Sequence, residues 1–156
     1  SSGQTISQPF TVAFQSELLQ VKPGDKILEI GTGSGYQAAV LCEMGAKVYT
    51  IERIKELYRK TAAFLASINY RPKKMIYGDG HKGYEKGSPY DGIIVTAGAS
   101  EIPNHLLTQL KIGGRLVLPI GDQIQKMILY TKKNDSEYNI QDFGEFKFVP
   151  MLKDKT

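Results

Sequence analysis

Short runs rich in aliphatic and β-branched residues alternate along this chain with longer segments in which apolar residues recur at helical spacing. Strands are expected at five of the short runs, residues 26–30, 47–52, 73–77, 92–96 and 115–120. Helices are expected at residues 9–20, 36–44, 54–69 and from Pro103 onward. This alternation of strand and helix is typical of a parallel sheet with helices on both faces.

The last part of the chain follows a different pattern. Residues 126–131 and a segment around 138–149 resemble the two strands of an antiparallel hairpin, and they are joined by the turn-forming residues 134–136, Asn-Asp-Ser. The predicted fold is therefore a three-layer α/β sandwich whose mostly parallel sheet ends in a C-terminal antiparallel hairpin. A chain of 156 residues suffices for one substantial core, so a single domain over residues 1–156 is expected.

A glycine-rich loop connects the first predicted strand to the helix that follows it. Glycine occupies alternate positions, at Gly31, Gly33 and Gly35, and Glu29 precedes them. Glycine accepts positive φ angles and has no Cβ to keep a ligand away from the backbone, while the next helix begins with unpaired N–H groups. In parallel α/β sheets, nucleotide-like ligands bind at such a loop.

The residues around these glycines narrow the choice of ligand. Tyr36 stands where the dinucleotide pattern G-x-G-x-x-G requires its third glycine, and the chain has no Gly-Lys-Ser or Gly-Lys-Thr of a phosphate-binding loop. A carboxylate at Glu29 repels phosphate but can accept a hydrogen bond from an ammonium group. S-adenosylmethionine carries an amine, a carboxylate and no phosphate, so it is the ligand that these residues favour.

Two further acidic residues lie at the ends of the next two predicted strands. At Glu52 a carboxylate can bind ribose hydroxyls, and at Asp79 it can accept a hydrogen bond from an adenine amino group. Each residue alone has a simpler explanation, because Glu52 can be an exposed strand-end carboxylate and Asp79 a turn residue between glycines. A glycine loop and two acids at three successive strand ends together favour a nucleoside-containing cofactor.

Composition and charge argue against several other kinds of protein. The net charge of +4 is spread along the sequence rather than interleaved with aromatic residues on one element, so a nucleic-acid groove is not expected. Cys42, the single cysteine, lies in an apolar helical segment and is expected to pack in the core. His81 and His105 lack metal-ligand spacing, so no metal site is expected. With neither a membrane-span pattern nor a signal segment, a cytoplasmic monomer is expected.

Several segments resemble the protein-L-isoaspartate O-methyltransferase family in order and spacing, namely residues 29–37, 48–54, 78–80, 90–97 and 113–117. Two more segments are specific to that family among class I methyltransferases. Residues 3–9, Gly-Gln-Thr-Ile-Ser-Gln-Pro, resemble its active-site signature, and residues 148–152, Phe-Val-Pro-Met-Leu, resemble its C-terminal substrate segment. The resemblance covers residues 3–152 and implies the Rossmann-like fold of a class I methyltransferase.

The resemblance also implies an activity and a set of site residues. A methyl group passes from S-adenosyl-L-methionine, which becomes S-adenosyl-L-homocysteine, to the free carboxylate of an L-isoaspartyl residue in a damaged protein or peptide. The methyl ester then closes to a succinimide, which begins repair. Ser7 is implied as the catalytic serine, and Ser7 and Val149 as substrate-binding residues. The residues implied to bind the cofactor are Thr5, Ile6, Glu29, Gly31, Thr32, Gly33, Ser34, Glu52, Asp79 and Gly80.

The chain departs from the family pattern at its start. Family members usually have a further helical segment before the Thr-Ile-Ser motif, whereas only residues 1–4 precede Thr5 here, so a domain that lacks this segment is expected. Two alternatives follow: a catalytically impaired protein that binds S-adenosylmethionine, and a methyltransferase for another substrate. An Asn/Asp-Pro-Pro-aromatic motif after the fourth strand would resemble the enzymes that methylate amino groups of nucleic acids. Residues 96–99 lack this motif, which argues against a nucleic acid as the other substrate.

Overall fold

The chain folds as the predicted α/β sandwich, in a computed structural model that describes residues 9–146 and residue 155. Its strands are β1 (Lys26–Ile30), β2 (Lys47–Glu52), β3 (Lys74–Tyr77), β4 (Tyr90–Val95), β5 (Leu110–Ile120), β6 (Gln125–Lys132) and β7 (Tyr138–Phe146). Its helices are α1 (Pro9–Leu19), α2 (Tyr36–Glu43), α3 (Lys55–Ser67) and α4 (Asn104–Thr108), with two short 3-10 turns, η1 (Gly80–Lys82) and η2 (Glu85–Gly87). None of the described helices is long and apolar enough to cross a membrane.

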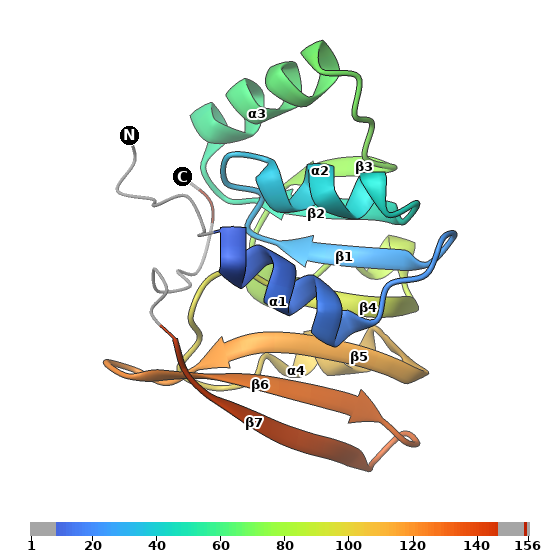
Figure 1. Ribbon diagram of the computed structural model, residues 1–156, viewed down its shortest axis with the longest axis vertical. Helices are drawn as coiled ribbons and strands as arrows, with labels where there is room; N and C mark the ends of the chain where they lie inside the picture. Colours follow the sequence, from blue (N-terminus) through green and yellow to red (C-terminus); the bar gives the residue numbers. More distant parts are fainter. Residues whose placement is uncertain (1–8, 147–154, 156) are drawn as a thin grey trace.

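The seven strands form one sheet in the order β3-β2-β1-β4-β5-β6-β7 (Figure 1). Strands β1 to β5 pair in parallel, and β6 and β7 continue the sheet as antiparallel neighbours, which confirms the predicted C-terminal hairpin. After β1 the chain adds β2 and β3 on one side of β1, and it then crosses over to place β4 on the other side. Such a reversal creates a crevice at the carboxyl ends of the strands, where α/β proteins bind ligands.

The strand register brings three residues side by side at that crevice. Ile30 of β1 pairs with Ile51 of β2 and with Val95 of β4. The next residue of each strand, Gly31, Glu52 and Thr96, therefore follows directly at the same edge of the sheet.

The largest difference from a predicted strand boundary is at the start of β5. β5 begins at Leu110 rather than at residue 115, because the Gly113-Gly114 pair expected to precede the strand lies inside it. Gly113 has a φ of 85°, and the pairing of β5 with β4 shifts register between Tyr90 and Gly92. A glycine with positive φ can bend a strand at a bulge without ending it. The last predicted strand is seen as far as Phe146, and residues 147–149 lie outside the described residues.

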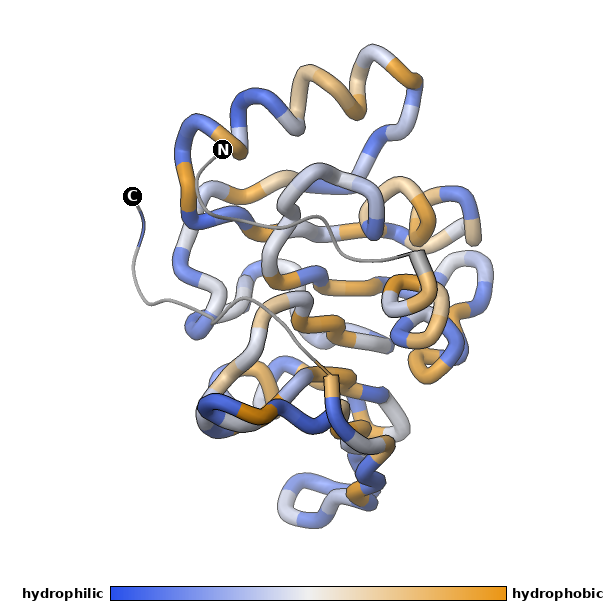
Figure 2. Tube along the Cα trace, turned by 60° about the vertical axis from the view of Figure 1, so that its left-hand side comes forward, coloured by the Kyte–Doolittle hydropathy of each residue, from blue (hydrophilic) through white to orange (hydrophobic). Residues whose placement is uncertain are grey.

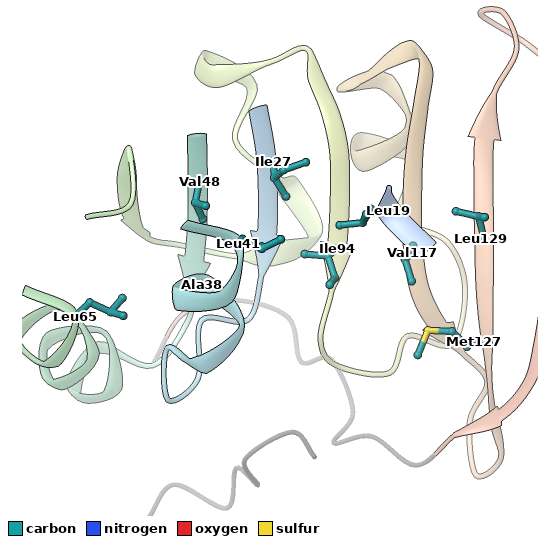
Figure 3. Packing of buried hydrophobic residues seen from close by; sticks show 10 residues of the cluster. All are labelled: Leu19, Ile27, Ala38, Leu41, Val48, Leu65, Ile94, Val117, Met127 and Leu129. Carbon is teal, nitrogen blue, oxygen red and sulfur yellow. The ribbon is translucent and has the colours of Figure 1, made fainter. Parts of the chain in front are cut away.

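Two apolar clusters hold the layers together, one on each face of the sheet. The first joins α1, α2 and α3 to the sheet through side chains such as Leu19, Leu41 and Leu65 (Figure 3). The second lies under α4 on the other face, around Leu106. Hydrophobic residues accordingly concentrate in the central strands (Figure 2). Cys42 packs against the first cluster, as predicted.

Candidate functional site

Gly31 joins the glycine loop to the end of β4. Its N–H donates to the carbonyl of Ile51 at 2.9 Å, and the Thr96 hydroxyl donates toward the carbonyls of Ile30 at 2.9 Å and Gly31 at 2.8 Å. Gly31 has a φ of 96°, and a Cβ at this position would lie 2.6 Å from Thr96 Oγ1. The loop therefore requires glycine here in order to lie against β4.

Gly33 presents an open surface. It has a φ of 54°, and a Cβ there would meet no atom within 4 Å. Its N–H donates to Glu52 Oε1 at 3.0 Å, and its carbonyl accepts a bond of 2.6 Å from the Thr61 hydroxyl. The loop is thus fixed from β2 and α3 while the Cα side of Gly33 stays accessible to a ligand. At Gly35, in contrast, a Cβ would lie 2.9 Å from Thr61 Cγ2.

Glu52 connects the loop to the start of α3. Besides the bond from Gly33, its Oε2 accepts a bond of 2.9 Å from the N–H of Ile54, and the residue is 4% exposed. Each carboxylate oxygen can accept two hydrogen bonds, so both retain acceptor capacity. Glu52 can therefore hold the loop in place and still bind ribose hydroxyls.

Glu29 lies inside the protein below the loop and is fully buried. Its Oε1 accepts a bond of 2.5 Å from the Thr50 hydroxyl, which lies 2.6 Å from the Thr32 hydroxyl. Its Oε2 has no hydrogen-bond partner among the described residues. Burial raises the pKa of Glu29 to about 8; the Thr50 bond opposes this shift and the nearby Glu52 adds to it. An ammonium group beside Oε2 would supply the missing partner and favour the ionised acid.

Asp79 follows β3 at the same edge of the sheet. Its Oδ1 accepts a bond of 2.9 Å from the N–H of His81 and so caps η1, which is the turn role considered from the sequence. The side chain also borders a cleft of about 290 Å³. The cleft is lined by Gly78, Asp79, Lys82, Gly83 and Lys155. An adenine ring is compatible with such a position because β3 lies next to β2, which carries Glu52.

The other predicted site residues fall into two groups. Thr32 is buried, Ser34 is exposed in the loop, and Gly80 is buried at the start of η1. The residues implied by the two family-specific segments, Thr5, Ile6, Ser7 and Val149, lie outside the described residues. No group of three or more metal-binding side chains is found in residues 9–146 or at residue 155.

Three threonines that support the loop were not identified from the sequence. Thr50 bonds Glu29, Thr61 bonds Gly33, and Thr96 bonds Gly31. In the sequence, Thr50 is a hydroxyl residue within an apolar strand, and Thr96 follows another apolar strand directly. This pattern can be recognised from the sequence, but it does not predict which atom each hydroxyl contacts.

The residues present fit S-adenosylmethionine. A buried acid lacks a partner at Oε2, the loop is open at Gly33, and carboxylates lie at two adjoining strand ends. Fold and site together define a Rossmann-like methyltransferase of class I.

Comparison with known proteins identifies the family. Residues 1–156 match the sequence model of the protein-L-isoaspartate (D-aspartate) O-methyltransferase family. A protein-L-isoaspartate O-methyltransferase of Christiangramia forsetii is 60% identical over 155 residues, which are 99% of this chain and 73% of that protein. This chain therefore belongs to the protein-L-isoaspartate (D-aspartate) O-methyltransferase family, as predicted.

Solved structures agree with this assignment. A protein-L-isoaspartate O-methyltransferase superimposes with a TM-score of 0.86 at 32% identity over 93% of this chain, which spans 47% of that protein. A family structure from Plasmodium falciparum, in complex with S-adenosyl-L-homocysteine, gives a TM-score of 0.82 at 28% identity over 99% of this chain and 78% of its own. The predicted fold class and the predicted methyl donor are thus confirmed.

Proposed function

We propose that this chain methylates the free carboxylate of L-isoaspartyl residues in damaged proteins and peptides, with the site at the carboxyl ends of β1, β2 and β3. The observation that supports this most strongly is the adjacency of Gly31, Glu52 and Thr96 at the switch point of the sheet. Family membership supplies the class of acceptor.

We assign the cofactor contacts to residues at or near the three strand ends. Glu52 binds the ribose hydroxyls, Asp79 accepts a bond from the adenine amino group, and Glu29 pairs with the ammonium group through Oε2. The backbone of the glycine loop, residues 31–35, contacts the cofactor directly. The remaining contacts are assigned to Thr5, Ile6, Gly31, Thr32, Gly33, Ser34 and Gly80.

The acceptor needs little chemical help. A carboxyl group with a reference pKa of roughly 3 to 4 is already ionised and nucleophilic at neutral pH, so no general base is required. When bound, S-adenosylmethionine supplies a methyl group on a sulfonium; the carboxylate oxygen forms the new O–CH₃ bond and the electrons of the broken C–S bond stay on sulfur. Anion and cation charges both disappear, so a site that excludes water favours the transfer.

Ser7 acts by positioning the acceptor. It precedes the first residue of α1 by two positions, and we assign its hydroxyl the role of donating a hydrogen bond to the isoaspartyl carboxylate. Helix α1 is held near the crevice by Gln15 Nε2, which donates to the carbonyl of Val95 at 3.1 Å, and by the 2.8 Å bond from Gln37 Nε2 to Ser16 Oγ. We assign Val149 a contact to the substrate through its own backbone.

The proposal extends to the state of the protein. We assign residues 1–156 to one methyltransferase domain. It acts as a cytoplasmic monomer on isoaspartyl proteins and peptides and engages neither nucleic acid nor membrane.

Methyl-group transfer to matched peptides tests the proposal. The protein is incubated with S-adenosylmethionine labelled in the methyl group and with peptides that differ only in isoaspartate or aspartate. Label is expected on the isoaspartyl peptide alone, with lower turnover but similar affinity for S-adenosylhomocysteine in Ser7→Ala. Equal label on both peptides would favour a methyltransferase of another specificity. Cofactor binding without any label would favour an impaired binding protein.

A further inference from the structure

Four phenylalanines form an aromatic cluster where α1 begins and β7 ends: Phe10, Phe14, Phe143 and Phe146. Phe14 lies at its centre, with ring centroids 6.1 Å from Phe10, 5.8 Å from Phe143 and 5.5 Å from Phe146. Phe14 and Phe146 also pack against the first core cluster. Phe10 is nevertheless 71% exposed and Phe143 is 38% exposed. The core-facing rings thus support two rings that face solvent.

The cluster lies at the crevice edge of the sheet. Phe146 pairs with Gln125, next to Lys126, which pairs with Ile120 at the carboxyl end of β5. Helix α1 begins at the same edge, because Gln15, further along it, donates to the carbonyl of Val95. Phe10 and Phe146 come from opposite ends of the described chain and both pack against Phe14, so both ends of the described fold lie beside the crevice.

Chain connectivity then limits how far the cluster can be from the acceptor site. Phe10 follows Ser7 by three residues, and Phe146 precedes Val149 by three residues. Consecutive Cα atoms are about 3.8 Å apart, so three residues span at most roughly 11 Å. An extended substrate covers that distance in about three residues, since a strand rises about 3.3 Å per residue. The exposed ring of Phe10 is therefore within reach of side chains close to the isoaspartyl residue, and the exposed ring of Phe143 belongs to the same cluster through Phe14.

From these positions we propose that Phe10 and Phe143 form a binding surface for an aromatic or large aliphatic side chain of the substrate polypeptide, within about three residues of the isoaspartate. The inference rests on the proposed function, since it takes a polypeptide as the methyl acceptor. Exposed aromatic rings fixed by packing are suited to this role, because they offer apolar area with little loss of side-chain freedom on binding. The cluster would make the enzyme selective for sequence around the damaged residue.

The test compares isoaspartyl peptides that carry either Phe or Ser at each of the three positions on either side of the isoaspartate. The proteins are the wild type, Phe10→Ser, Phe143→Ser and the double variant. Phe64→Ser is a matched control, because Phe64 is 51% exposed on α3 and makes no contact with the cluster. The wild type is expected to favour Phe at one position by roughly tenfold in kcat/KM, mainly through KM.

The double variant is expected to methylate the Phe and Ser peptides equally, whereas Phe64→Ser keeps the preference. A preference that persists in the double variant, or a wild type that shows none at any position, would overturn the inference. If no peptide is methylated at all, the proposed function fails, and the affinities of the same peptides for the protein saturated with S-adenosylhomocysteine decide the inference separately. Sedimentation of the wild type as a dimer that Phe10→Ser dissociates would instead assign the surface to self-association.

Discussion

At the residue scale, Glu29 is the residue through which the proposed site would link folding to cofactor binding. Its carboxyl group is fully buried, and its Oε2 has no partner among the described residues. The protein tolerates this because the pKa of Glu29 rises to about 8, so the acid is mostly neutral near pH 7. A cationic group at Oε2 would reverse that preference. Glu29 is therefore expected to lower the stability of the cofactor-free protein at high pH, and the proposed pairing with the ammonium group would stabilise the complex.

Glu29→Gln should separate these two effects. The pKa of Glu29 is near 4.5 when unfolded and about 8 when folded, so only the folded state holds the proton between these values. The free energy of unfolding of the wild type should then fall as pH rises from 5 to 8. Compared with Glu29→Gln, which has no such proton, the fall should be up to roughly 1.4 kcal/mol per pH unit. Urea unfolding of both proteins without ligand measures this difference.

The same variant should bind S-adenosylhomocysteine at least roughly tenfold more weakly, because Gln cannot pair as an anion with the ammonium group. Wild-type affinity should also rise with pH up to about 8, since binding requires loss of the proton. Calorimetry that finds equal affinities and equal pH profiles would remove Glu29 from the cofactor site.

Glu52→Ala should affect both the loop and the ligand. The N–H groups of Gly33 and Ile54 each lose an acceptor, which should lower the unfolding free energy by roughly 1–3 kcal/mol. Affinity for S-adenosylhomocysteine should fall by roughly tenfold or more, because the ribose hydroxyls also lose their hydrogen-bond acceptor. Glu52→Gln keeps one acceptor oxygen and serves as the matched control with a smaller loss. Unchanged affinity in Glu52→Ala would show that Glu52 does not contact the cofactor.

At the element scale, the glycine loop combines three different constraints in five residues. Gly31 lies against Thr96 of the β4 end, Gly33 is open, and Gly35 packs against α3. The sequence predicts that the loop exists and where it begins, because glycines at alternate positions after a buried strand are a local pattern. It does not predict which glycine faces a ligand, since the neighbours Thr61 and Thr96 come from distant segments.

Alanine substitutions should distinguish these roles. In Gly35→Ala the new Cβ would lie 2.9 Å from Thr61 Cγ2 and 3.2 Å from Leu65, at a φ of 89°, so a stability loss of roughly 2–4 kcal/mol is expected. In Gly33→Ala the new Cβ meets no neighbour, so the unfolding free energy should fall by only about 1 kcal/mol. Relative to this small loss of stability, the loss of cofactor affinity should be larger than in Gly35→Ala. Unfolding and calorimetry on both variants check this, and the opposite ranking of stability would contradict the assigned packing.

At the scale of the whole molecule, the sequence predicts most of the fold because each strand and helix carries its own local pattern. The misplaced start of β5 arises from Gly113, where a bulge in a strand has the same sequence signal as a turn. The buried network of Glu29, Thr50 and Thr32 was missed for another reason. It is made by residues 18 to 21 positions apart that meet only after β1 and β2 pair.

A structure of the protein with S-adenosylhomocysteine and an isoaspartyl peptide tests the account most directly. The cofactor is expected across the carboxyl ends of β1, β2 and β3, with its ribose hydroxyls on Glu52, its ammonium group on Glu29 and its adenine beside Asp79. The isoaspartyl carboxylate is expected beside the cofactor sulfur and hydrogen-bonded to Ser7. A cofactor bound away from Gly33 and Glu52, or a peptide carboxylate that does not face the sulfur, would contradict the account.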